Sequence, residues 1–119
     1  MITFDEARHF LQKALEFGGN THSLDDIKRA IDSGQLTFWA GRNSAVITEI
    51  EDYPQHRVLQ FYLAGGNLAE LETMYPAIEK WGREQGCTMA STAGRPGWER
   101  TFLKREGWKP RTVLMTKEL

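Results

Sequence analysis

The sequence is poor in several features that define common protein classes. Its 119 residues include one cysteine, Cys87, which excludes an internal disulfide and is typical of a reducing compartment. No apolar stretch is long enough to cross a membrane, so we expect no membrane partner. The first ten residues, MITFDEARHF, are acidic and amphipathic rather than signal-like. We therefore expect a cytoplasmic protein, or one packed into an assembly that forms inside a cell.

The sequence also lacks a metal-binding pattern and a strong net charge. Its three histidines lie in separate segments without metal-ligand spacing, which predicts no metal site: His9, His22 and His56. The 15 basic and 16 acidic residues nearly cancel, so the composition does not favour a polyanion binder. The charge is unevenly distributed, however, because residues 95–111 hold six basic residues against Glu99 and Glu106.

Two amphipathic helices are predicted at the start of the chain. Thr3 and Glu6 form a capping-box pattern, and apolar residues follow at helical spacing until Gly18. Ser23 is a second predicted N-cap, and that helix ends at Gly34.

An extended pattern follows the helices. Short connections predict an antiparallel meander of three strands at 36–39, 45–50 and 58–64. A helix from 68, a strand at 87–92, a short helix opened by residues 94–97 and a last strand at 111–116 complete the chain. The order α-α-β-β-β-α-β-α-β predicts a single α/β domain, 1–119, with a mixed sheet flanked by helices. The unit spanning 58–92 predicts a parallel pair of strands.

Two stretches, LAGGNL at 63–68 and WERTFLKREGW at 98–108, carry a resemblance to a known family. With the element order, they resemble the GNAT (acyl-CoA N-acyltransferase) superfamily over nearly the whole chain. The sequences of these two stretches are similar to those of small GNAT-like proteins of tailed bacteriophages. The resemblance implies a GNAT-like fold and, in active members, an acetyl-CoA site.

The resemblance assigns the cofactor site to the strand-to-helix corner. The matching residues here are Gly65, Gly66, Asn67 and Leu68. Backbone N–H groups at a helix start bind phosphates well. The Arg/Gln that opens the family's loop is absent, and the loop is shorter, so fewer N–H groups can converge on a pyrophosphate. We therefore expect this corner to serve as a turn rather than as a ligand site.

Candidate catalytic residues are few. The resemblance implies a glutamate or a held water as general base, and Glu49 and Glu51 lie on a central strand. They alternate with Ile50 and also fit a solvated strand face. The family's acid, a tyrosine in the late helix, is replaced here by Leu103. Water or Tyr62 is then the candidate acid, although a strand tyrosine packed in the core is an alternative interpretation of Tyr62.

The basic C-terminal part is a candidate surface for a protein or a nucleic acid. It combines basic and aromatic residues: Arg95, Trp98, Arg100, Lys104, Arg105 and Trp108. Tryptophan and arginine are enriched at interface centres. A solvated outer face with tryptophans in the core fits the same pattern.

The resemblance and the basic C-terminal part together suggest three functions. The first is a phage-type protein of GNAT fold without an intact acetyl-CoA site, which binds a partner such as a phage structural protein in the virion or during assembly. The second is an active N-acetyltransferase that transfers the acetyl group of acetyl-CoA to an amine. The third is a nucleic-acid-binding module. The missing Arg/Gln and Leu103 favour the first over the second, and the near-neutral charge disfavours the third.

Overall fold

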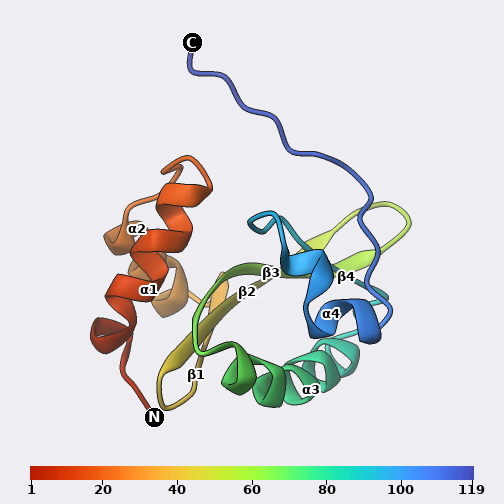
Figure 1. The fold of residues 1–119 in the computed structure, drawn as a ribbon, viewed down its shortest axis with the longest axis horizontal. Coiled ribbons are helices and arrows are strands. Elements are labelled where there is room, and N and C mark those ends of the chain that lie inside the picture. The colour runs from red at the N-terminus through yellow and green to blue at the C-terminus, as the bar shows by residue number, and fades with distance from the viewer.

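The computed structural model describes residues 1–119 as a four-stranded mixed sheet flanked by helices (Figure 1). The strands are β1 (Leu36–Ala40), β2 (Ser44–Asp52), β3 (Arg57–Gly66) and β4 (Met89–Thr92), and they lie in that order. The first three pair antiparallel, as the short connections predict, and β4 pairs parallel to β3. None of the helices combines the length and apolar character needed to span a membrane.

Helices cover both faces of the sheet. The first face carries α1 (Phe4–Phe17) and α2 (Leu24–Asp32), and the second carries α3 (Leu68–Glu84). A short 3₁₀ turn, η1 (Trp98–Arg100), and the one-turn helix α4 (Phe102–Arg105) follow β4. The two predicted N-caps are confirmed, since Thr3 and Ser23 both form complete capping boxes.

Alternation along the strands produces two cores, one on each face. The first packs α1 and α2 against the sheet through residues such as Leu11, Ile27 and Ile47, all fully buried. The second packs α3 against Val46 and Leu59. A third, aromatic cluster joins Tyr75 of α3 to Phe102 and Leu103 of α4.

The C-terminal end differs from the sequence prediction. The predicted last strand, 111–116, pairs with no other strand, and residues 109–119 extend away from the domain (Figure 1). A strand needs a neighbouring backbone for its hydrogen bonds, and this segment has none within its own chain. The predicted strand at 87–92 begins two residues later, at Met89, and the predicted short helix divides at Thr101 into η1 and α4.

Candidate functional site

The site begins where β3 and β4 separate. The two strands pair only from Val58–Met89 to Phe61–Thr92. Immediately after this, Tyr62 is an extra residue in the pairing of β3 with β2, because Ile47 faces Leu63 while Thr48 faces Phe61. Such a bulge bends its strand. The remainder of β3, Tyr62 to Gly66, therefore has no strand beside it on the β4 side.

The Gly65–Gly66 corner lies at the end of this open stretch. Together with Leu68 and Leu71 it lines a hollow of about 370 Å³, which the 95–101 segment closes on the other side. Both glycines are required by packing. A Cβ on Gly65 would lie 2.7 Å from the Cβ of Phe10 on α1, and one on Gly66 would lie 2.3 Å from the Asn43 carbonyl oxygen. Gly66 also has a φ of +116°, which L side chains rarely adopt.

Several N–H groups at the corner already have acceptors within the protein. The N–H of Asn67 donates to Ser44 Oγ (2.9 Å), and that of Glu70 donates to Asn67 Oδ1 (3.0 Å). The N–H of Leu71 donates to the Asn67 carbonyl oxygen (2.9 Å). Of the first helical N–H groups, those of Leu68 and Ala69 remain without an intrahelical acceptor. Asn67 is thus the N-cap of α3 rather than an open ligand donor.

Arg95 is the basic residue that lines the hollow at this corner. It lines the same hollow as Gly65 and Gly66 and is exposed. Its guanidinium carbon lies 5.8 Å from the centre of the Phe17 ring at the end of α1. The resemblance places an arginine or glutamine before the glycines, whereas Arg95 was predicted to belong to a separate surface. The signal that was available is the turn sequence Gly94-Arg95-Pro96-Gly97, which brings an arginine back to the end of β3.

A second polar group forms on the α1–α2 side of the sheet. Tyr62 Oη lies 2.8 Å from His22 Nδ1, and Thr21 Oγ1 lies 2.9 Å from the same nitrogen. Burial raises the pKa of Tyr62, and a hydrogen bond from Thr21 partly opposes this. The sequence does not indicate the contact between His22 and Tyr62, because the two residues are 40 positions apart in the chain.

The two candidate glutamates occupy different surroundings. Burial raises the pKa of Glu49, the charge of Glu51 raises it further, and His22 opposes both. The register pairs Glu49 with Gln60 of β3, next to the bulge at Tyr62. Glu51 lies two pairs farther from the bulge and accepts a hydrogen bond of 2.5 Å from Tyr53. The structure therefore brings Glu49 towards the Tyr62–His22 pair and leaves Glu51 with Tyr53.

Leu103 is buried, with 8% of its surface exposed, in the aromatic cluster with Tyr75 and Phe102. Trp108 packs at the same cluster, and its indole N–H donates to Tyr75 Oη (2.9 Å). Trp98 is half-buried against the cores of α3 and α4. Both tryptophans thus contribute mainly to the interior.

The basic residues of this region are exposed, and two of them form ion pairs. Arg105 pairs with Glu72 (2.9 Å) and Arg100 with Glu99 (3.4 Å). Lys104 and Arg95 have no ion-pair partner among the chain's acidic residues.

Comparison with known proteins supports the fold. No protein-family model matches the sequence, and no curated relative matches it significantly. Among solved structures, a probable acetyltransferase superposes with a TM-score of 0.70 at 8% identity, covering 98% of this chain and 90% of that one. Wild-type TTHA1254 from Thermus thermophilus gives a TM-score of 0.60 at 14% identity, covering 99% and 93%. At these identities the likeness concerns architecture, and this chain therefore has an acetyltransferase-like, mixed α/β fold.

Proposed function

We propose that this chain acts by binding a protein partner and does not transfer acetyl groups. The observation that carries the proposal is the state of the Gly65–Gly66 corner. The N–H groups of Asn67 and Glu70 already donate to Ser44 and Asn67, so a pyrophosphate would have to compete with formed hydrogen bonds. The glycines themselves are accounted for by Phe10 and Asn43. Of the first N–H groups of α3, only those of Leu68 and Ala69 are left for a phosphate, which is few for a diphosphate.

The position of Leu103 supports the same conclusion. In the GNAT resemblance this position carries the acid that protonates the departing thiolate. An aliphatic side chain cannot donate a proton. Leu103 is instead part of the packing between α3 and α4, so it has a structural use that an acid would disturb.

A phage structural protein is the partner class that the sequence resemblance suggests. The experiment that separates a partner-binding protein from an enzyme is a titration with acetyl-CoA, with coenzyme A as second ligand. We expect no saturable heat at millimolar ligand.

A second candidate function is acetyl transfer, and two contacts favour it. Arg95 lies across the hollow from Gly65 and would supply a charge for a phosphate. The Tyr62–His22 pair would supply a proton carrier beside the open edge of β3. In this case Arg95→Gln would abolish binding of coenzyme A, whereas Tyr62→Phe would retain binding and lose turnover. Both side chains are partly or fully exposed, so these substitutions leave the core intact.

Nucleic-acid binding is the third candidate and has less support. Arg100 and Arg105 pair with Glu99 and Glu72, and the neighbouring tryptophans pack inward. A nucleic-acid binder should lose affinity steeply with added salt, and neutralising Arg100 and Lys104 should reduce that slope. We expect no such slope.

A further inference from the structure

The sheet has a free edge at β4, and residues 111–116 have strand composition but no strand partner. We propose that residues 111–116 of one molecule add as a strand to the β4 edge of a second copy, and that the exchange is reciprocal. The inference rests on the proposed function and names the partner surface: the first partner of this chain is another copy of itself.

The acceptor is the outer edge of β4. This strand is last in the sheet, and its only strand partner is β3. Unpaired N–H and C=O groups along an edge are a template for another strand. Met89 lies on this edge with 46% of its surface exposed, which is unusual for a large apolar side chain on a strand.

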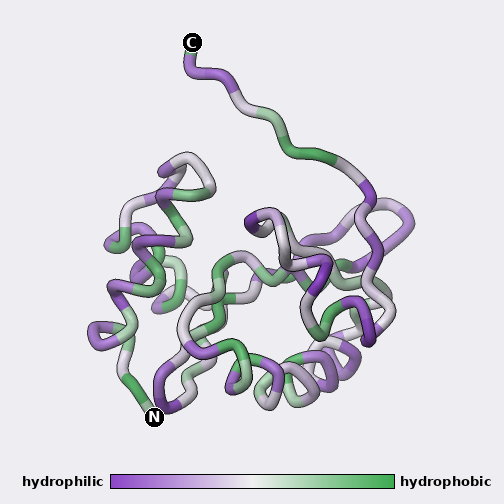
Figure 2. The backbone as a smooth tube through the Cα atoms, in the orientation of Figure 1, coloured by the Kyte–Doolittle hydropathy of each residue, from purple (hydrophilic) through white to green (hydrophobic).

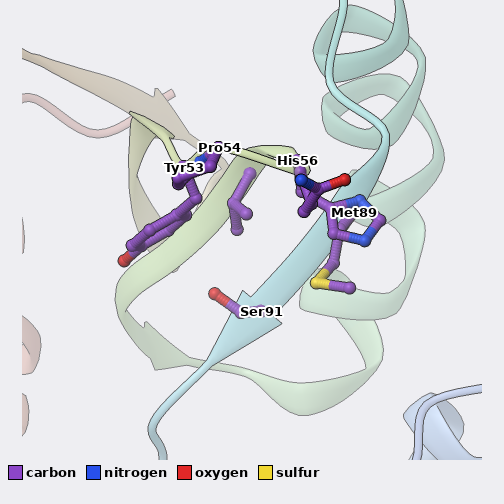
Figure 3. A pocket seen from close by; sticks show the side chains of 7 residues that line it. Tyr53, Pro54, His56, Met89 and Ser91 are labelled. Carbon is purple, nitrogen blue, oxygen red and sulfur yellow. The ribbon is translucent and has the colours of Figure 1, made fainter.

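The hollow beside β4 gives this edge an apolar floor. It measures about 440 Å³ and is lined by the β2–β3 turn, Val58 of β3, and Met89 and Ser91 of β4. In Figure 3, Tyr53, Pro54 and His56 of the turn stand around the same depression as Met89 and Ser91. The hollow lies on the same sheet face as α1 and α2, but outside the part that these helices cover. The helices cover Ile47 and Leu63, which lie towards the other end of β2 and β3.

The donor is the stretch RTVLMT at 111–116. It has the composition of a strand, with β-branched and large apolar residues. Val113, Leu114 and Met115 expose 83%, 70% and 84% of their surface. No residue after Trp108 makes a backbone hydrogen bond within the chain. Figure 2 shows this hydrophobic stretch well separated from the domain.

The residues before the donor strand keep it extended, and the strand is long enough to cover β4. Trp108 fixes the chain to Tyr75, and Pro110 follows two residues later. Proline disfavours a helical turn in the residue before it, so Lys109 stays extended. Six residues in strand conformation span roughly 20 Å, which is more than β4 needs.

A second copy fits better than an unrelated protein for two reasons. The donor strand and the acceptor edge are present in the same chain. A two-fold exchange therefore pairs both donor strands with both acceptor edges and gives a closed dimer. The tail is also basic at Lys109, Arg111 and Lys117, and Glu51 at the end of β2 offers it an acidic group through its contact with Tyr53 of the hollow. Asp52, in contrast, already pairs with Arg57 (3.5 Å).

The test combines sedimentation equilibrium with amide hydrogen exchange on the full chain. We expect a dimer of the 13.6-kDa chain, with slow exchange of the 111–116 amides that becomes fast on dilution to monomer. Leu114→Pro removes an N–H from the donor and should abolish both dimer and protection. Met89→Lys charges the acceptor and should do the same. Glu118→Pro, beyond the strand, is the matched control and should leave the dimer unchanged.

Three outcomes would overturn the proposal. A monomer with an unprotected tail would mean that the edge stays open. A monomer with a protected tail would mean that the segment folds back on its own β4. A dimer whose tail exchanges freely would mean that another surface forms the interface. None of these outcomes changes the heat of the acetyl-CoA titration, so failure of this inference and failure of the proposed function are distinguishable.

Discussion

Gly65 of β3 leaves no room for a side chain, because a Cβ there would lie 2.7 Å from the Cβ of Phe10 on α1. The close approach lets α1 rest directly on the end of β3. A glycine at this corner is therefore needed whether or not a ligand binds. The same holds for Gly66, where a Cβ would meet Asn43 and Ser44.

Replacing either glycine should reduce stability without any ligand present. We expect Gly65→Ala to cost about 1–3 kcal/mol by overpacking. Gly66→Ala should cost at least as much, since strain from a positive φ adds on the order of 1–3 kcal/mol. Urea denaturation measures both. Gly19→Ala is the control, because Gly19 has a φ of +96° but open space around it, and it should show only the cost of strain. Equal losses at all three positions would contradict the packing argument.

Glu70 ties α3 to the β1–β2 turn. Its carboxylate accepts the N–H groups of Arg42 (2.8 Å) and Asn43 (2.9 Å). A hydrogen bond from Ser44, followed by those from Asn43 and Arg42, lowers the pKa of Glu70 from its ordinary 4.5. A lowered folded-state pKa gives stability that is present above 4.5 and lost as the pH falls through the folded value. Glu70→Gln should therefore be less stable than wild type at pH 7, and the difference should close in acid. Thermal unfolding between pH 3 and 7 measures this, and a pH-independent difference would argue against an ionic role.

Trp108 holds the start of the C-terminal tail on Tyr75. Burial, and after it the hydrogen bond to Glu79, raises the pKa of Tyr75 to about 12. The hydrogen bond from the Trp108 N–H acts in the opposite direction and partly offsets this rise. Because the folded-state pKa lies above 10, the stability from neutral Tyr75 is present below pH 10 and lost as the pH rises towards 12.

Trp108→Phe should cost about 1 kcal/mol for the lost hydrogen bond, with some packing loss in addition. It should also raise the pKa of Tyr75 further, which absorbance titration of the tyrosines detects. Trp81→Phe is the matched control, because Trp81 packs against Trp39 and lies in a different cluster from Tyr75. A Tyr75 titration that is the same in Trp108→Phe and wild type would mean that the bond does not form in solution.

Local signals in the sequence predicted most of the fold. Thr3 and Ser23 mark helix starts through side-chain caps that need only their own neighbours, and both are confirmed. The meander and the parallel β3–β4 pair follow from short loops and one helical crossover. The strand at 111–116 was wrong for the isolated chain, because strand composition does not supply a strand neighbour.

The site was harder to predict than the fold. Tyr62 and His22 meet only because a bulge bends β3 and the α1–α2 loop lies over it. Arg95 joins the glycine corner through a turn that follows a different strand. Such contacts depend on tertiary placement, which residue spacing does not encode. The absence of an acid at Leu103 rests on the resemblance and stays a prediction, although the burial of Leu103 agrees with its aliphatic side chain.

Calorimetric titration of the full chain with acetyl-CoA at low salt tests the central claim most directly. Coenzyme A is the second titrant, and Arg95→Gln is the matched variant. We predict no saturable heat at millimolar concentrations of either ligand, in wild type or variant. Saturation at micromolar acetyl-CoA, lost in Arg95→Gln, would contradict the account and make the Gly65–Arg95 hollow a cofactor site.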